Sequence, residues 1–351
     1  MEPGSRSSWV SRMAASGLLH CLLAGYALGG PSLPAGIDSG KAPGVDAERL
    51  AKAIRAVIKI KTRALPDARS LTTLGAEREG SAVVVGPDGL VLTIGYLIAE
   101  AETIELEDAG GRLISATAVA YDHGSGFGLV RALTPLGIAP LELGNSGSLA
   151  ESDSAIVSAA GGIDAASSVT VVSRRRFAGY WEYMIDDAIF TSPPRFDHSG
   201  AALLARDGTL VGIGSLIVPN ATASPPRIPG NMFVPTSLLK PILEEMVATG
   251  SSRRGKHPWL GITSQELEGR VFISKIQADS PAERAGLHQG DIVLGIGGTS
   301  VSRLEDFYTH LWRDRQPGDE VTLSVLQGAE LKKITVKSID RSEYARAKTK
   351  V

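Results

Sequence analysis

The stretch Phe196-Asp197-His198-Ser199-Gly200-Ala201-Ala202-Leu203-Leu204 decides the fold of this chain, together with Asp207-Gly208-Thr209-Leu210-Val211-Gly212-Ile213 that follows it. A Ser-Gly pair leads into an apolar run, an Asp-Gly turn and a second apolar run. This order predicts a buried hairpin with Ser199 at its entrance. An exposed serine is a poor nucleophile until a neighbouring base takes its proton. Whether Ser199 can react therefore depends on where a histidine lies.

The composition predicts a soluble globular chain with more than one domain. The chain has 351 residues, of which 43% are hydrophobic and 21% charged. Two domains are the default for this length. The formal charge is -2, from 36 basic and 38 acidic residues, so nucleic acid is not a predicted partner. No metal-ligand spacing joins the histidines, and neither a metal nor another cofactor is predicted.

The amino terminus has the features of an export signal. Basic residues precede an apolar run over residues 13–28, which is shorter than the ~20 residues of a membrane-spanning helix. Small residues at 27–29 fit a cleavage site, so residues 1–29 are predicted to be a signal peptide that exports the chain to the periplasm or cell envelope. An uncleaved membrane anchor is the alternative. The only cysteine, Cys21, lies in this run, so the mature chain would have no disulfide or thiol chemistry.

Strand patterns dominate after a Gly/Pro-rich, flexible segment over residues 30–44 and a short helix over 45–54. Two apolar runs, Ser81–Val85 and Leu90–Ile94, flank a Gly-Pro-Asp-Gly turn and predict a hairpin. A series of short strands predicts an antiparallel barrel or sandwich. The further predicted strands are 103–106, 114–120, 128–131, 154–158, 168–172 and 188–191.

The first domain is predicted to extend over residues 45–248. After a proline-rich loop at 218–229 comes a predicted helix over 237–248, capped by Ser237, with Pro241 near its first turn and Gly250 after its end.

Residues 249–258 are a linker by composition. Their basic cluster is better explained by a solvated connector than by contact with an anionic surface. A second, smaller domain is predicted over 259–340, followed by a tail over 341–351.

Five features in this order make the chain resemble the HtrA/Deg family. They are Gly80-Ser81-Ala82-Val83-Val84, Gly89-Leu90-Val91-Leu92-Thr93, the Ser199-Gly200 loop, the helix after Phe233-Val234-Pro235, and Trp259-Leu260-Gly261-Ile262. The resemblance covers roughly residues 45–340. It implies a mainly β chain, a chymotrypsin-like double β-barrel followed by a small α+β PDZ domain.

The resemblance also places the catalytic triad, and two of its three members are replaced. Tyr96 stands at the histidine position, Gly126 at the aspartate position, and Ser199 is kept. A tyrosine with a pKa near 10 stays protonated at neutral pH and cannot readily accept the serine proton. Asp197 replaces the oxyanion-site glycine and adds a negative charge there. Loss of triad members costs about four to six orders of magnitude in rate.

Other histidines offer no clear replacement. His198 adjoins Ser199, but neighbouring side chains in an extended or tightly turned segment point apart. His123 is predicted to be a surface loop residue. Ser199 is therefore predicted to be a turn serine that is bonded to the local backbone, with a working nucleophile as the alternative.

The motifs of the second domain are better preserved than those of the first domain. Ser280-Pro281-Ala282-Glu283 and Ser302-Arg303-Leu304-Glu305 are predicted capping boxes, the second opening a helix through about Arg313. The predicted strands of this domain are 292–296, 321–326 and 333–339, and the order of its elements resembles that of a bacterial PDZ domain.

A PDZ domain binds a peptide as an added strand and receives its terminal carboxylate on backbone N–H groups of a glycine-containing loop. Leu304 and Leu311 fit a groove wall or the core equally well, because helical spacing cannot separate the two. The predicted peptide-binding residues are Trp259, Leu260, Gly261, Ile262, Leu304, Tyr308 and Leu311.

These features predict an exported pseudoprotease that binds polypeptide C-termini or unfolded proteins as an adaptor, scaffold or chaperone. The alternative is an active or weakly active serine endopeptidase in envelope protein quality control. A purely structural role is a third possibility. Family members usually form trimers, often through aromatic residues near the start of the protease domain. No Phe, Tyr or Trp occurs between Tyr26 and Tyr96, which leaves a trimer without support from the sequence.

Overall fold

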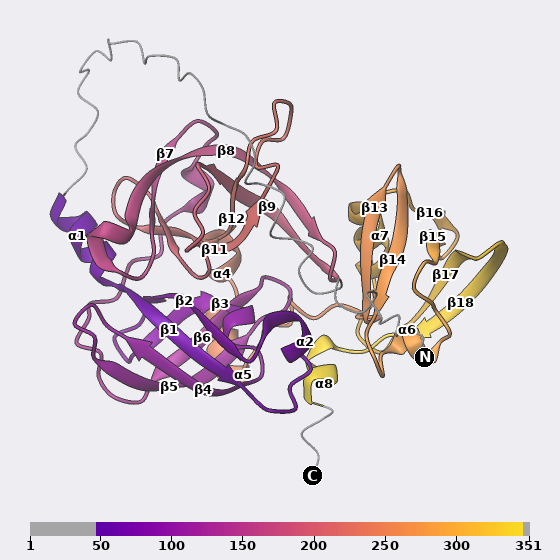
Figure 1. Ribbon diagram of the computed structural model, residues 1–351, viewed down its shortest axis with the longest axis horizontal. Helices are drawn as coiled ribbons and strands as arrows, with labels where there is room; N and C mark the ends of the chain where they lie inside the picture. The colour runs from indigo at the N-terminus through magenta and orange to yellow at the C-terminus, as the bar shows by residue number, and fades with distance from the viewer. Residues whose placement is uncertain (1–46, 347–351) are drawn as a thin grey trace, which may run out of the picture. The chain divides into compact units, whose positions relative to one another are not determined.

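The computed structural model describes residues 47–346, which form two closed six-stranded barrels and one further sheet (Figure 1). The predicted signal peptide with Cys21, the segment 30–44 and residues 347–351 lie outside the described residues. Among the helices of residues 47–346, none has the length and apolar character to cross a bilayer. The chain is mainly β, as predicted.

The first barrel has the strand order β1-β2-β3-β6-β5-β4, and every pair is antiparallel. The hairpin predicted around Gly89 is confirmed, with Gly89 at a φ of +77°, a conformation that glycine adopts without strain. Helix α1 Ala47–Arg55 precedes the barrel, and α2 Leu71–Leu74 and α3 Gly95–Ile98 interrupt it. The strands are β1 Val57–Ala64, β2 Glu77–Val84, β3 Leu90–Ile94, β4 Ala101–Glu107, β5 Leu113–Tyr121 and β6 Phe127–Ala132.

The second barrel has the order β10-β11-β12-β9-β8-β7. The predicted Ser199 hairpin is confirmed as β10 and β11, in which Ala202 pairs with Ile213. Buried aliphatic and aromatic side chains fill both barrels, Phe127, Phe190 and Phe233 among them. The strands are β7 Ser154–Ser158, β8 Ala166–Gly179, β9 Tyr183–Ser192, β10 Ala202–Leu204, β11 Leu210–Val218 and β12 Gly230–Pro235, with short 3-10 turns at Ser146–Ser148 and Gly162–Ala165.

The single helix predicted over residues 237–248 is wrong. The structure has two short helices, α4 Thr236–Leu239 and α5 Leu243–Thr249, and Ser237 lies inside α4 instead of capping it. Pro241 separates them, because proline has no N–H to donate and its ring clashes with the carbonyl four residues earlier. Gly250 ends α5 as predicted, in the left-handed conformation with its N–H donating to the Met246 carbonyl.

The remaining residues form a sheet of order β13-β14-β15-β17-β18, with β16 beside β15. The Ser280 cap is confirmed, because its hydroxyl accepts from the Glu283 N–H. The Ser302 capping box is wrong, since α7 begins after Arg303 and the Leu304 N–H donates to the Glu266 carboxylate instead. The elements are β13 Ile262–Leu267, β14 Arg270–Ile276, α6 Pro281–Arg284, β15 Ile292–Ile296, β16 Thr299–Ser300, α7 Leu304–Trp312, β17 Glu320–Gln327, β18 Glu330–Lys337 and α8 Arg341–Arg346.

The segment 249–258 is only partly the solvated connector predicted from its composition. Arg253 and Arg254 are exposed, but the Ser252 side chain is buried and both its N–H and its hydroxyl donate to the Asp122 carboxylate, at 3.1 and 2.6 Å. His257 stacks on Trp312 with ring centroids 4.6 Å apart. The segment is therefore fastened to the first barrel at Ser252, a contact that composition does not predict.

Candidate functional site

Ser199 lies in a turn that is fixed by both barrels. Its carbonyl accepts from the Ser81 N–H of β2 at 2.8 Å, and the Gly200 N–H donates to the Gly214 carbonyl of β11 at 2.9 Å. Gly200 has a φ of +73°, and a Cβ there would lie 1.9 Å from the Ser81 carbonyl oxygen. Only glycine satisfies both conditions. The turn thus presents Ser199 at a defined place between the barrels.

Tyr96 occupies the space beside the serine. Its hydroxyl lies 2.9 Å from the Ser199 Oγ and 2.9 Å from the Ser215 carbonyl oxygen. A phenol has one hydrogen, and a carbonyl oxygen can only accept. The phenol therefore donates to Ser215, and the Ser199 hydroxyl donates to the phenol oxygen. Burial raises the pKa of Tyr96 to about 12, so this partner is a neutral phenol and a very weak base.

The position of the expected aspartate holds no carboxylate. Gly126 has a φ of +84°, and a Cβ there would lie 3.0 Å from the Tyr183 hydroxyl. That hydroxyl donates to the Ser125 carbonyl at 2.8 Å. The nearby carboxylate of Asp122 is already engaged, accepting from the N–H and hydroxyl groups of both Ser125 and Ser252. Asp122 therefore holds the loop and the segment after α5 in place.

Asp197, at the expected oxyanion position, is paired within its own loop. Its carboxylate accepts from the Arg195 Nε at 2.8 Å and forms an ion pair with the same guanidinium. Arg195 also donates to the Ser167 Oγ. The His198 Nδ1 lies 3.1 Å from the Arg195 carbonyl, so the ring bonds to Arg195 and not to Ser199. Burial lowers the pKa of His198.

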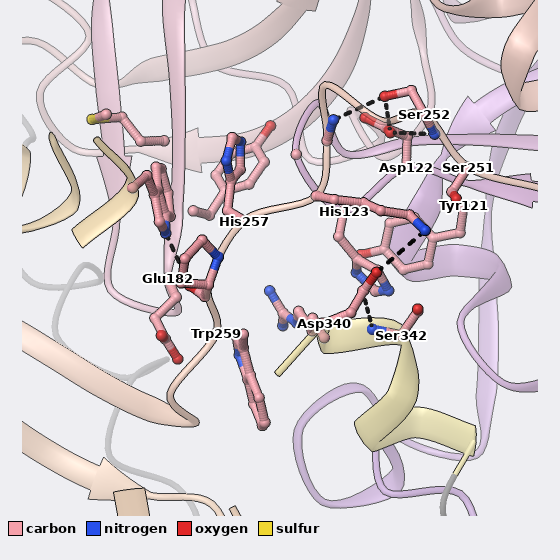
Figure 2. A pocket seen from close by; sticks show the side chains of 18 residues that line it. Tyr121, Asp122, His123, Glu182, Ser251, Ser252, His257, Trp259, Asp340 and Ser342 are labelled. Carbon is pink, nitrogen blue, oxygen red and sulfur yellow. Dashed lines mark hydrogen bonds and ion pairs between the residues drawn. The ribbon is translucent and has the colours of Figure 1, made fainter. Parts of the chain in front are cut away.

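His123 is not the surface residue that the sequence predicts. Its side chain is half-buried, its buried Nδ1 has no hydrogen-bond partner among residues 47–346, and its ring lies 4.0 Å from that of Tyr121. Burial lowers its pKa to about 3. Figure 2 shows it at a small pocket with His257, Glu182 and Asp340; Ser199 is not part of that lining. His123 thus gives Ser199 no base.

Among residues 47–346, no group of three or more His, Cys, Asp or Glu side chains could hold a metal ion. The chemistry at Ser199 is therefore that of a serine hydroxyl bonded to a neutral phenol, beside a salt-bridged aspartate.

The glycine-containing loop of the second domain holds a carboxylate. The N–H groups of Leu260, Gly261 and Ile262 donate to the two carboxylate oxygens of Glu182, at 2.8, 2.8 and 3.0 Å. Gly261 has a φ of +86°, and a Cβ there would lie 2.3 Å from the Ser280 Cβ. The loop conformation and its tight packing both require glycine. Three of the predicted peptide-binding residues therefore converge on one anion.

The other four predicted binding residues lie in different surroundings. Trp259 pairs with Ile339 through its backbone, and its ring lies 4.5 Å from that of Tyr344 in α8. Leu311 is fully buried in the core of the second domain, and Leu304 packs against that core from its edge. Tyr308 is fully buried, and its hydroxyl donates to the Gly179 carbonyl at 2.7 Å.

Sequence reasoning missed the tip of the β8–β9 hairpin, residues 179–182. Glu182 lies in a run with three aromatic residues, Tyr180-Trp181-Glu182-Tyr183, within a chain that has 5% aromatic residues. Such a cluster of aromatic residues is an available signal for a contact surface, although it does not identify the surface it contacts.

Two known domain families match this chain: the trypsin-like peptidase domain at residues 80–213 and the PDZ domain at residues 258–338. The serine protease Do-like HtrA of Bacillus subtilis (strain 168) is 30% identical over 157 residues, which cover 39% of this chain and 33% of that protein. The periplasmic serine endoprotease DegP of Escherichia coli (strain K12) is 24% identical over 242 residues, covering 64% and 49%. The chain spans about half or less of the length of these two relatives.

Solved structures of the same type share the fold. The HtrA-type protease AlgW with decapeptide has a TM-score of 0.52 and 20% identity, covering 84% of this chain and 98% of that chain. The serine endoprotease from Yersinia pestis has a TM-score of 0.51 and 19% identity, covering 86% and 99%. Both carry the arrangement of strands described above at low sequence identity.

Proposed function

Because this chain is an HtrA-type protein with a trypsin-like peptidase domain and a PDZ domain, we propose that it is a pseudoprotease that binds polypeptides. In this proposal the PDZ groove takes C-termini or unfolded segments, and the protein works as an adaptor, scaffold or holding chaperone. It acts in the periplasm or cell envelope, as the names of its DegP relatives suggest.

One observation carries the loss of catalysis: the Tyr96 hydroxyl lies 2.9 Å from the Ser199 Oγ, where the reaction needs a base. A serine attacks only when its proton can move to a group of suitable pKa. The buried phenol, with its pKa raised to about 12, would have to become a cationic oxygen to take that proton. No carboxylate at Gly126 stabilises such a charge, so the geometry supports binding and not hydrolysis.

The loop of Leu260, Gly261 and Ile262 supports the binding half of the proposal. Three N–H groups aimed at one carboxylate are the arrangement with which PDZ domains receive a peptide terminus. This chemistry does not depend on Ser199.

A comparison of the wild-type protein with Ser199→Ala tests the catalytic half. We expect neither protein to be labelled by a fluorophosphonate probe or to cleave an unfolded substrate, while an active serine protease in the same assay does both. Labelling or cleavage that disappears in Ser199→Ala would establish the endopeptidase alternative.

Peptide titration tests the binding half. A ten-residue peptide with an apolar, free C-terminus should bind the full chain, and the same peptide with an amidated C-terminus should bind more weakly, because the loop N–H groups lose the charge they receive. Equal affinity for both peptides, or no binding of either peptide to any variant, would exclude the PDZ groove as a receptor for C-termini.

A further inference from the structure

A PDZ domain takes its peptide between an edge strand and a helix, which correspond to β13 and α7 in this chain. Strand β13 lies at the end of the sheet order, so one of its edges is free to accept another strand. The Ser264 N–H of β13 donates to the Tyr180 carbonyl at 2.8 Å. This main-chain bond joins the hairpin tip of the second barrel to the edge that a bound peptide would use.

The opposite wall holds the same hairpin tip. The Tyr308 hydroxyl of α7 donates to the Gly179 carbonyl at 2.7 Å and accepts from the Glu182 N–H at 3.1 Å. Ala178 and Met184, on either side of the tip, pack against the core of the second domain. The tip therefore contacts both walls of the groove.

The end of the groove is closed by the Glu182 side chain. Glu182 is 6% exposed, and its carboxylate accepts the three N–H groups of the loop over residues 260–262. Burying a carboxylate is costly, and burial raises the pKa of Glu182 to about 7, although the three N–H bonds act in the opposite direction. A side-chain carboxylate here takes the place of a peptide's terminal carboxylate.

Resting on the proposed peptide-binding function, we infer that residues 179–182 are a built-in ligand of the PDZ groove. A free polypeptide C-terminus must displace the hairpin tip before it binds. The groove thus selects ligands that offer a terminal carboxylate and a backbone able to pair with β13, because these are the two contacts they must replace.

The backbone of the tip is held for this contact. Glu182 has a φ of +54°, a left-handed conformation that is strained in a residue other than glycine and persists where surrounding contacts fix it. The Trp181 carbonyl accepts from Arg341 of α8 at 3.2 Å, and the Trp181 ring stacks on Tyr183 with centroids 5.5 Å apart. The hairpin therefore presents Glu182 from a supported turn.

Amide hydrogen exchange in the full chain without peptide tests the docking directly. We expect the amides of Leu260, Gly261 and Ile262 to be protected in the wild type. They should exchange roughly tenfold faster in Glu182→Ala, while the amides of β17 stay unchanged, because a local contact opens without global unfolding. Glu182→Gln keeps the side-chain size but loses one acceptor oxygen, so the three loop amides should also exchange faster than in the wild type.

A matched control comes from the same hairpin. Asp186→Asn also removes one negative charge, but Asp186 is exposed and pairs only with Arg176 on the barrel surface. This variant should leave the exchange of the loop amides as in the wild type. Rapid exchange of the three amides already in the wild type would overturn the inference.

Peptide affinity tests the competition. The ten-residue peptide with a free apolar C-terminus should bind Glu182→Ala roughly tenfold more tightly than the wild type or Asp186→Asn, because the apparent dissociation constant scales with the inverse of the open fraction. The amidated peptide should bind more weakly than the free peptide in every variant. Peptide affinity that is equal in Glu182→Ala and Asp186→Asn, with binding present, would overturn displacement.

The two readouts separate the inference from the proposed function. If the loop amides lose protection in Glu182→Ala and no variant binds either peptide, the hairpin occupies the groove and the peptide-binding function fails. If the free peptide binds more tightly than the amidated one and the exchange pattern never changes, the function stands and the built-in ligand does not.

Discussion

At Ser199 the neighbouring side chains form hydrogen bonds that join the two barrels. The Tyr96 hydroxyl connects Ser199 to the Ser215 carbonyl, and thus α3 of the first barrel to β10 and β11 of the second. Tyr183 fills the side of Gly126 where a side chain would project. The Tyr96 and Tyr183 side chains thus occupy the space beside Ser199 and Gly126.

Tyr96→Phe tests this structural role. The change leaves the Ser215 carbonyl without its donor inside the protein, so the free energy of unfolding should fall by about 1–3 kcal/mol. Urea unfolding at neutral pH measures the loss. The control is Tyr180→Phe, at a side chain that is exposed, where we expect no comparable change. Equal stability of Tyr96→Phe and the wild type would show that the phenol only fills space.

Placing histidine at position 96 and aspartate at position 126 together should not give the protein protease activity. In Tyr96→His/Gly126→Asp the aspartate must adopt a positive φ of 84° and its Cβ must approach the Tyr183 hydroxyl to 3.0 Å. Such a backbone conformation costs about 1–3 kcal/mol. We expect lower stability than for Tyr96→His alone and no labelling by a fluorophosphonate probe. Probe labelling of the double variant, lost on adding Ser199→Ala, would contradict this.

The resemblance to the HtrA/Deg family assigns Tyr96, Gly126 and Asp197 to triad and oxyanion positions, and this assignment stays a prediction. The hydrogen-bond partners around these positions could not be predicted from the sequence. Tyr96 and Ser215 are 119 residues apart, and Tyr183 and Ser125 are 58 apart. Such contacts depend on how the two barrels meet, which local patterns do not encode.

At the scale of elements, the predicted helix ends were correct where the hydrogen-bond partners lie in the same segment of the chain. The Ser280 hydroxyl caps its own helix and Gly250 ends α5, both as predicted. The prediction for Ser302 failed because Glu266, from another element, accepts the Leu304 N–H. The helix over 237–248 failed because a proline at its fourth helical position removes a donor that a continuous helix needs.

Gly250→Ala tests the end of α5. Gly250 has a φ of +83°, and an alanine there pays the strain of the left-handed conformation, so the protein should lose about 1 kcal/mol of stability. Thermal unfolding gives the difference. Gly110→Ala is the matched control, since Gly110 is exposed and is not among the glycines with positive φ. A loss no larger than in the control would mean that this cap is dispensable.

At the scale of the whole molecule, the pocket around His123 brings together the first barrel, the segment after α5 and the start of α8. The buried Nδ1 of His123 has no partner, while Arg341 disfavours its charge and Asp340 favours it. With a pKa of about 3 in the fold and about 6.5 unfolded, His123 stays neutral in the native protein. Protonation therefore favours the unfolded chain.

The stability contributed by this neutral His123 is full above pH 6.5 and is lost as the pH falls from 6.5 toward 3. At pH 5 the loss should be about 1–2 kcal/mol, allowing for the half-exposed ring. Urea unfolding of the wild type and of His123→Gln at pH 7 and pH 5 measures it. The variant should lose less stability on acidification, whereas His288→Gln, at an exposed residue, should behave as the wild type. If His123→Gln loses as much stability between pH 7 and pH 5 as the wild type, other groups cause the loss.

The fastening of Ser252 to Asp122 limits how far a released PDZ domain can travel. Only residues 253–258 remain between that anchor and Trp259, and six extended residues reach about 20 Å. A tether of that length gives the hairpin tip an effective concentration in the millimolar range at its own groove. A peptide at micromolar concentration must therefore bind the groove more tightly than the hairpin tip does in order to displace it. Ligands at high local concentration, or with several binding segments, displace the tip more easily than a dilute single chain.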